Sequence, residues 1–298
     1  MLQHLNATQT KPKRVVIIGA SGFVGQSIQE RLQASDVEVL PVSSSDINLL
    51  EPNSDKQLSK LLQQKDSIVT ASAIAPCKDL SMLKDNIILM ENLFSAVQLA
   101  NVSHILNISS DAIYTDSTEP LTEDSATSPN SIHGIMHLTR ERVLQDMFTD
   151  IPCATIRPTL IYGVKDPHNG YGPNQFRRLA ASKKPIILFG KGEERRDHVL
   201  IDDVAELAYR ILMYKSIGSL NAATGKVVSF YDVAELVTGC FDYSVAIQTS
   251  PRNGPMPHNG YRPFSAEQTQ HAFSDFTYTH IEDGIKKVHT EMMENIDG

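Results

Sequence analysis

The chain has 298 residues, of which 41% are hydrophobic and 21% charged, and its formal net charge is -8. This composition is typical of a globular protein long enough for a nucleotide-binding domain with a smaller lobe, and it excludes disordered and fibrous classes. The acidic balance, without any basic run, argues against a nucleic-acid partner.

Redox and targeting features favour a cytoplasmic protein. The cysteines Cys77, Cys153 and Cys240 are scattered and form no CxxC motif, so we interpret them as small buried residues in a reducing compartment. No apolar run reaches the roughly 20 residues that cross a bilayer, so no membrane partner is expected. Residues 1–13 are polar and are predicted to be a flexible lead-in.

Strand-like and helix-like segments alternate along the first half of the chain. The β-branched run 14–18 predicts a buried strand, and residues 27–34 have helical spacing. The remaining predicted strands are 37–42, 67–71, 105–108 and 154–158, and the remaining predicted helices are 58–62, 83–100 and 132–147. This alternation predicts an α/β fold, a Rossmann-type doubly wound parallel sheet with a smaller C-terminal substrate-binding lobe.

The predicted domain division follows from the same pattern. Residues 14–166 are expected to form the dinucleotide-binding domain, and residues 199–213 to pack back on it. Residues 167–298, where the alternation loosens into loops rich in glycine and proline, are expected to form mainly the substrate-binding lobe.

A glycine-rich turn joins the first predicted strand to the first predicted helix. Gly19, Gly22 and Gly25 allow a tight turn, a close approach of the backbone to a pyrophosphate and close helix packing. The unpaired N–H groups at the start of the helix then face the phosphates. The turn therefore predicts a site for NAD or NADP.

The second predicted strand does not decide between the two cofactors. It ends in residues 42–45, which are neither acidic nor basic, whereas an acid there favours NAD and a base favours NADP. Asp46 either reaches the ribose or closes a local turn, and the sequence leaves both readings open.

Several motifs follow one another in a fixed order along residues 14–287. They are the glycine spacing 19, 22, 25, the asparagine-led segment 86–93, the Ser-Ser-x-x-x-Tyr segment 109–114, the Arg-Pro segment 156–163, the segment 190–205 and Arg262-Pro263. In this order they resemble the extended short-chain dehydrogenase/reductase family, in its nucleotide-sugar epimerase, dehydratase and reductase branch.

The resemblance implies roles for individual residues. Ser110 stands where the family has its catalytic serine or threonine, and Arg196 and Arg262 stand where it binds a substrate diphosphate. Asn174, with Tyr171 and Phe176, lies where the lobe meets the sugar nucleotide, although Phe176 is equally compatible with a core position. The cofactor is expected to contact Gly19, Ser21, Gly22, Phe23, Val24, Gly25, Ser43, Asp46, Ala71, Ser72, Ala73 and His137.

The resemblance also implies a homodimer. Family members pair two helices per subunit, which correspond here to the helices that begin near Leu83 and Ile132. The predicted interface residues are Leu89, Leu93, Leu138 and Val143.

The chain departs from the family where its catalytic tyrosine and lysine are expected. His133 and His137 occupy those positions, four residues apart and therefore on one helix face. Three interpretations remain open. His133 can replace tyrosine as acid/base, with His137 at the ribose; catalysis can have moved to Asp111; or the protein can bind its ligands without catalysis. Tyr114 is expected to be a packed structural residue.

A metal site at the histidine pair is disfavoured. Histidines at i and i+4 can chelate zinc, but no glutamate follows His133 and no third ligand is evident nearby. The sequence therefore predicts an NAD(P)-dependent nucleotide-sugar epimerase or keto-sugar reductase with an atypical catalytic centre. The alternative is a catalytically inactive regulatory protein that binds NAD(P) or a sugar nucleotide.

Overall fold

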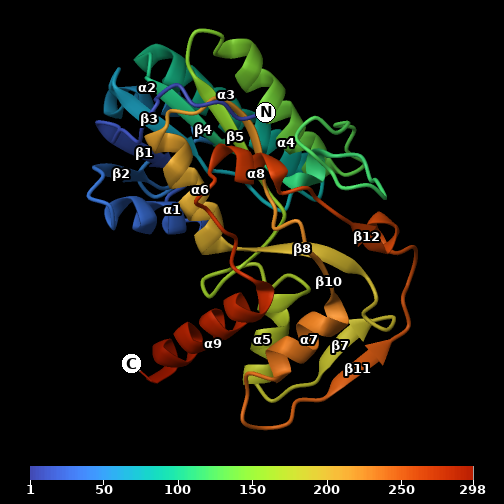
Figure 1. Ribbon diagram of the computed structural model, residues 1–298. Coiled ribbons are helices and arrows are strands. Elements are labelled where there is room, and N and C mark those ends of the chain that lie inside the picture. The colour runs from blue at the N-terminus through green and yellow to red at the C-terminus, as the bar shows by residue number, and fades with distance from the viewer. Residues whose placement is uncertain (298) are drawn as a thin grey trace.

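The computed structural model describes residues 1–297 and centres on one parallel sheet (Figure 1). Its six strands lie in the order β2-β1-β3-β4-β5-β9, and every neighbouring pair is parallel. The strands are β1 (Arg14–Ile18), β2 (Val39–Val42), β3 (Asp66–Thr70), β4 (His104–Ile108), β5 (Cys153–Pro158) and β9 (Gly218–Ala222). This order confirms the predicted doubly wound α/β fold.

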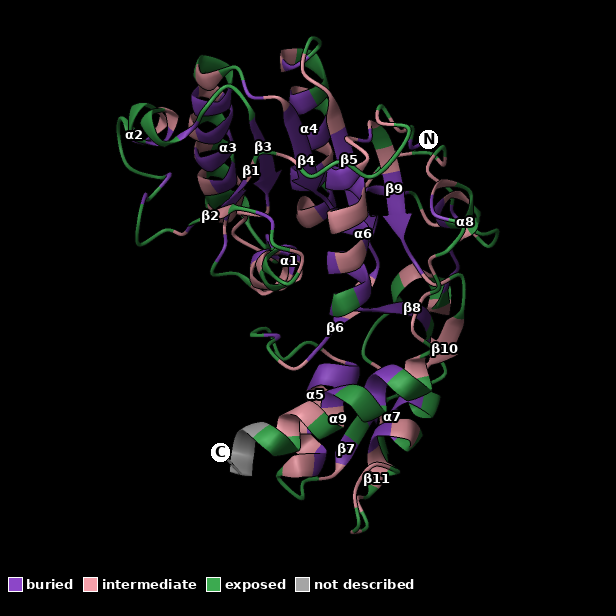
Figure 2. Cartoon of the chain, turned by 60° about the vertical axis from the view of Figure 1, so that its left-hand side comes forward, coloured by how far each residue is buried: buried purple, intermediate pink, exposed green. Residues whose placement is uncertain are grey.

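Helices cover both faces of the sheet. Alternate residues of a strand point to opposite faces, and in β1 the residues on both faces are apolar and pack against helices. Val15 and Ile17 of β1 pack with α1 (Phe23–Gln33) and α6 (Ile201–Met213). Val16 and Ile18 instead pack on the opposite face. The helices on that face are α2 (Ser54–Leu61), α3 (Leu80–Ala100) and α4 (Ile132–Met147). Burial of the strands on both faces explains their unbroken hydrophobic sequence (Figure 2).

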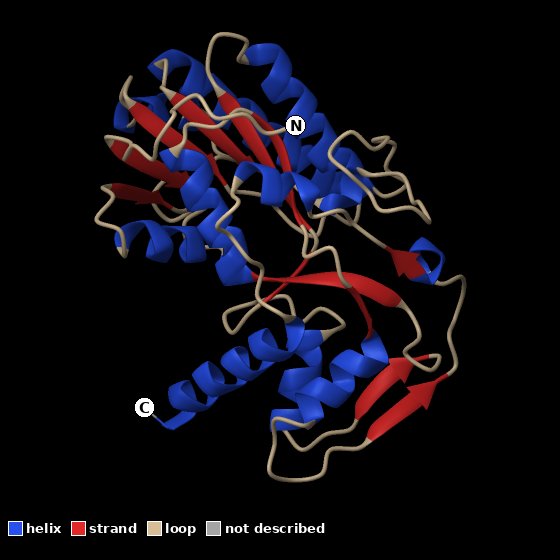
Figure 3. Cartoon of the chain, viewed as in Figure 1, coloured by secondary structure: helices blue, strands red, loops and turns tan. Residues whose placement is uncertain are grey.

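A smaller lobe lies at the opposite end of the molecule and has its own apolar core (Figure 3). It is built from α5 (Pro173–Ala181), β7 (Ile186–Phe189), α7 (Phe230–Thr238), β11 (Ile247–Ser250) and α9 (Ile281–Asp297). Four short strands run between this lobe and the sheet, namely β6 (Leu160–Tyr162), β8 (Arg195–Leu200), β10 (Val227–Ser229) and β12 (Tyr261–Arg262). The short helices are η1 (Asp111–Ile113), η2 (Pro257–Gly260) and α8 (Glu267–Ala272).

The prediction of a flexible lead-in at residues 1–13 is wrong. Leu2 is buried, and Gln3 pairs with Ile217 in a β-bridge. The ring of His4 stacks on Tyr214 at 4.4 Å between centroids. The lead-in is held by contacts with residues more than two hundred positions later, which its polar composition does not reveal.

The predicted interface residues on α3 and α4 are also corrected. Leu89 and Leu93 are 8% and 0% exposed and pack against the sheet, and Val143 is partly buried in the same core. Leu138 packs against a separate small cluster beside η1. The exposed apolar side chains of these helices are Leu80, Ile87, Leu99 and Ile135. Because α3 is apolar on more than one side, its sequence does not show which side faces outward.

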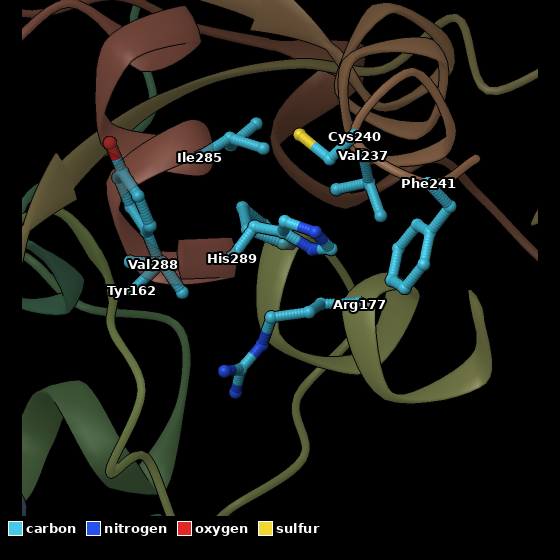
Figure 4. Close-up of a pocket in the computed structure, with 9 residues that line it drawn as sticks. Tyr162, Arg177, Val237, Cys240, Phe241, Ile285, Val288 and His289 are labelled. Atoms are coloured by element: carbon cyan, nitrogen blue, oxygen red, sulfur yellow. The ribbon is translucent and has the colours of Figure 1, made fainter. Parts of the chain in front are cut away.

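A small cavity lies inside the lobe between α5, α7 and α9 (Figure 4). The ring of His289 lies among Ile285, Val237 and Phe241, and the guanidinium of Arg177 points away from them. The cavity holds only about 10 Å³, which is room for about one water molecule. It is therefore too small for a nucleotide. Among the described residues, no helix is long and apolar enough to cross a bilayer.

The buried His104 makes stability sensitive to acid. Its Nε2 lies 2.7 Å from the carbonyl oxygen of Ser216, and burial lowers its pKa from 6.5 to about 4. Between about pH 6.5 and about pH 4, His104 is protonated in the unfolded chain but not in the folded one. The unfolding free energy should therefore fall by about 3 kcal/mol as the pH drops from about 6.5 to about 4.

Urea unfolding across this pH range measures the effect. His104→Gln keeps an N–H donor for Ser216 but cannot be protonated, so this part of the acid loss should disappear. His271→Gln, which changes an exposed histidine of α8, is the control and should leave the slope unchanged. Equal slopes in all three proteins would contradict the assignment.

Candidate active site

The glycine turn after β1 is shaped by two close approaches and one open position. Gly19 has a φ of 91°, and a Cβ there would lie 2.6 Å from the amide nitrogen of Ser72. A Cβ on Gly25 would lie 2.2 Å from the carbonyl oxygen of Gly19. A Cβ on Gly22 would meet only that same oxygen, at 3.3 Å. Gly19 and Gly25 are therefore required by the fold, whereas Gly22 keeps the outer face of the turn open.

A cavity of about 270 Å³ lies against this turn, at the carboxyl ends of β1, β2 and β3. The predicted cofactor residues that line it are Gly19, Ser21, Gly22, Ser43, Ala71, Ser72 and Ala73. Phe23 and Val24 instead pack on the core between the sheet and α1, and Gly25 lies below the turn. Sequence reasoning missed the apolar wall made by Ile47, Leu49, Leu50 and Leu89.

The cavity fits a dinucleotide. Its glycine turn exposes main-chain N–H groups at the start of α1, and its apolar wall suits a planar base. The hydroxyl of Ser72 is buried without a protein partner among the described residues, as a group that awaits a ligand would be. The residues present therefore match the predicted cofactor.

Asp46 closes a local turn at the end of β2. Its carboxylate accepts hydrogen bonds from the amide nitrogen of Ser43 at 2.8 Å and from the Ser43 hydroxyl at 2.6 Å. These bonds lower the pKa of Asp46. The structure therefore shows the local-turn arrangement that the sequence left as one of two readings.

The second half of the site begins where β4 ends. Ser110 accepts a hydrogen bond from the Ala112 amide at 3.2 Å and lies 3.4 Å from the Asp111 carboxylate. A Cβ on Gly134 would lie 2.2 Å from the carbonyl oxygen of Ala112, so this glycine lets α4 approach η1 closely. That approach brings His133, in the first turn of α4, toward Ser110 and Asp111.

The two histidines lie together on α4, with their ring centroids 4.7 Å apart. Nδ1 of His133 accepts a hydrogen bond from the main-chain N–H of Cys77 at 3.3 Å. Burial lowers the pKa of His133, and the nearby charge of Asp111 opposes this shift. Burial, together with His133 and Arg140, holds the pKa of His137 well below its usual value. Both imidazoles are therefore neutral near pH 7.

Two buried arginines fix α4 to the sheet. Arg140 donates to the carbonyl oxygens of Ser72 and Thr70, at 2.5 and 3.1 Å, at the edge of the cofactor cavity. Arg157 of β5 binds Glu141 at 2.7 Å. Sequence reasoning gave Arg140 no role, because its partners are main-chain atoms about seventy positions away.

Arg262 does not stand free for a substrate. It is 1% exposed, and its guanidinium binds the carboxylates of Asp111 and Asp116. The same group donates to the carbonyl oxygen of Asp111 at 2.7 Å and contacts Nδ1 of His258. Arg262 therefore anchors the loop that carries Ser110 and Asp111, and its predicted contact with a substrate diphosphate stays a prediction.

The other predicted substrate residues, Arg196, Asn174 and Phe176, lie in three different surroundings. In the strand register, Arg196 of β8 lies opposite Arg262 of β12. The guanidinium of Arg196 lies 3.2 Å from the Glu194 carboxylate, and the Arg196 side chain is little exposed. The amide of Asn174 accepts from the Gly163 N–H at 3.1 Å, so it holds a main-chain turn. Phe176 is fully buried in the lobe core.

Tyr171 and Tyr114 both pack against other side chains of the protein. Tyr171 packs in an aromatic group with Phe176 and Phe230. Tyr114 is buried, its hydroxyl donates to Asn221 at 2.7 Å, and burial raises its pKa to about 12. Tyr114 is therefore a packed structural residue, as expected. Among the side chains that the structure describes, those of residues 1–294, no three histidine, cysteine or acidic groups lie together as a metal site would require.

Comparison with known proteins agrees with this geometry. The model of the NAD dependent epimerase/dehydratase family matches residues 15–222. The trifunctional UDP-glucose 4,6-dehydratase/UDP-4-keto-6-deoxy-D-glucose 3,5-epimerase/UDP-4-keto-L-rhamnose-reductase of Arabidopsis thaliana is 25% identical, over 95% of this chain and 47% of that protein. The chain thus spans about half the length of that relative. The UDP-glucose 4-epimerase of Mycolicibacterium smegmatis is 26% identical, over 66% of this chain and 72% of that protein.

Solved structures share the fold at lower identity. UDP-glucuronic acid 4-epimerase from Bacillus cereus, in complex with UDP-glucuronic acid and NAD, superposes with a TM-score of 0.79 and 19% identity, covering 95% of this chain and 99% of that one. UDP-glucose 4-epimerase from Thermus thermophilus, in complex with NAD, gives 0.80 and 20%, covering 94% and 99%. With its glycine turn, cofactor cavity and matched residues 15–222, this chain belongs to the NAD-dependent epimerase/dehydratase family.

Proposed function

We propose that this protein is an NAD-dependent nucleotide-sugar epimerase or keto-sugar reductase whose reacting centre is formed by Ser110 and His133. The observation that carries the proposal is the continuity of the site. The segment that follows β3 lines the cofactor cavity with residues 71–74 and then, at Cys77, bonds to His133. His133 lies beside the loop of Ser110 and Asp111, so one segment links cofactor and reacting groups.

The proposed chemistry is hydride exchange at a sugar carbon. The bound cofactor would supply the redox chemistry, with NAD as the hydride acceptor and NADH as the hydride donor. Two side chains of this protein would hold the sugar oxygen at that carbon by hydrogen bonds. They are the Ser110 hydroxyl, in the loop after β4, and the His133 imidazole, on α4. Arg262 keeps the loop in place through Asp111. Arg196, whose guanidinium lies 3.2 Å from the Glu194 carboxylate, is the proposed contact for the substrate diphosphate.

The cavity favours NAD over NADP. Its lining contains no lysine or arginine, and the loop after β2 carries the carboxylate of Asp46 against Ser43. A 2′-phosphate placed there would meet an acid and no base. We expect NAD to bind at least about tenfold more tightly than NADP, a difference of about 1.4 kcal/mol.

Calorimetric titration with the two cofactors measures this preference. Ser44→Arg, which adds a cation to the cavity lining, should narrow or reverse it. Equal affinities for NAD and NADP in the unmodified protein would contradict the proposed specificity.

A homodimer through α3 and α4 is part of the same proposal. The side chains available for it are the exposed Ile87 and Ile135 rather than the buried Leu89 and Leu93. Light scattering that finds a monomer at micromolar concentration would rule this interface out.

A further inference from the structure

The hydrogen bond between Cys77 and His133 restricts where His133 can carry a proton. The donor is a main-chain N–H, which cannot accept, and it lies 3.3 Å from Nδ1 of the imidazole. Nδ1 therefore presents its lone pair to Cys77. Since a neutral imidazole has one N–H, that proton must be on Nε2.

We propose that the Cys77 amide holds His133 as a neutral imidazole with its proton on Nε2, so that His133 donates a hydrogen bond to the reacting sugar oxygen and does not itself change protonation. This inference rests on the proposed function for its substrate, but the state of the imidazole is a property of the protein alone. It differs from the acid/base role that the position of His133 implies.

Protonating Nδ1 would create a repulsive contact and break a hydrogen bond. The new N–H would point at the N–H of Cys77, and that amide, which belongs to a residue only 4% exposed, would lose its acceptor. Burial of the ring acts in the same direction, since it lowers the pKa of His133.

The groups that face His133 do not reverse this preference. Asp111 on η1 favours a charged imidazole, but its carboxylate already binds the guanidinium of Arg262. His137, on the same helix, is held neutral and therefore supplies no negative charge, and the Cys77 thiol, on the segment before α3, is kept neutral because burial raises its pKa. Among these neighbours only Asp111 favours the charged form, and its carboxylate is already paired with Arg262, so the neutral, Nε2-protonated form is the one that keeps the Cys77 hydrogen bond.

A neutral N–H donor can stabilise the negative charge that develops on the sugar oxygen. A preorganised N–H aimed at an oxygen on which negative charge develops lowers the barrier without losing its proton, and neutral histidine is known to act in this way in other enzymes. The proton exchanged with the sugar oxygen must then pass to or from another group. The Asp111 carboxylate, 3.4 Å from the Ser110 hydroxyl, lies next to the proposed place of that oxygen.

Nitrogen NMR of the uniformly ¹⁵N-labelled full chain tests the inference directly. Long-range proton–nitrogen correlations distinguish a protonated from an unprotonated ring nitrogen, and the His133→Gln spectrum identifies the signals of His133. We expect an unprotonated Nδ1 and a protonated Nε2 from about pH 8 down to below the ordinary histidine pKa of about 6.5. A protonated Nδ1, or an imidazolium that forms near pH 6.5, would overturn the proposal.

Two variants at Cys77 separate its amide from its thiol. Cys77→Ala keeps the N–H and should leave the His133 signals unchanged. Cys77→Pro removes the N–H and should allow Nδ1 to be protonated, so the pKa of His133 should rise. If the proline variant does not fold, the spectrum of the unmodified protein still decides.

Turnover gives an independent readout. The side-chain amide nitrogen of glutamine reaches the place of Nε2, so His133→Gln should keep activity within about tenfold, whereas His133→Ala should lose about 10²-fold. Equal losses in both variants would contradict the donor role. Failure of the proposed function is distinguishable, because it would appear as absent NAD or nucleotide-sugar binding while the NMR result stands.

Discussion

Replacing Gly22 by valine is expected to abolish NAD binding and to leave the fold intact. A Cβ at this position meets only the carbonyl oxygen of Gly19, at 3.3 Å, so the protein itself has nearly enough room. The rest of the valine side chain would occupy the cavity where the pyrophosphate approaches the turn. Calorimetric titration with NAD should show no binding, and thermal unfolding should remain cooperative.

Gly25→Ala is the matched control for this experiment. Its Cβ would lie 2.2 Å from the same Gly19 oxygen and beneath the turn, so it should lower the unfolding temperature. If Gly22→Val binds NAD as tightly as the unmodified protein, the cofactor does not lie on this turn.

Replacing Arg262 by methionine is expected to lower the unfolding free energy by about 3–5 kcal/mol, the usual loss when one partner of a buried ion pair is removed. The side chain of Arg262 is 1% exposed and binds both Asp111 and Asp116. Its loss would leave two carboxylates without their counter-ion at the joint between sheet and lobe. Urea unfolding at neutral pH measures the change.

Lys165→Met provides the comparison, because Lys165 pairs with Glu30 on the surface, where both side chains are about half exposed. That pair should contribute less than about 1 kcal/mol. If Arg262→Met were no more destabilising than Lys165→Met but weakened nucleotide-sugar binding, Arg262 would be a substrate ligand after all.

Local sequence predicted the parts of the fold that depend on neighbours along the chain. The hydrophobic run of β1 and the glycines at 19, 22 and 25 form one continuous strand, turn and helix, and Gly22 and Gly25 both approach the carbonyl oxygen of Gly19, a few positions away. The helix α4 lies at its predicted bounds because Ser131 caps it and accepts a hydrogen bond from the Gly134 amide at 3.1 Å.

Contacts between distant residues decided the rest. Arg262 and Asp111 are 151 positions apart, and Cys77 and His133 are 56 apart. Nothing in the local pattern shows that an arginine expected to bind a ligand is enclosed by two aspartates. Likewise, Cys77 was interpreted as a small buried residue, which describes its side chain but misses the role of its main-chain N–H.

Exchange of a hydride between NAD and a nucleotide sugar must produce NADH and an altered sugar. The experiment mixes the NAD-loaded protein with UDP-, GDP-, CDP- and dTDP-sugars, follows NADH by its absorbance and follows the sugar products by NMR. We expect transient NADH and an altered sugar with at least one of these substrates, and a rate about 10²-fold lower in Ser110→Ala. Tight binding of both NAD and a nucleotide sugar, with neither NADH nor any altered sugar, would show instead that the protein binds its ligands without catalysis.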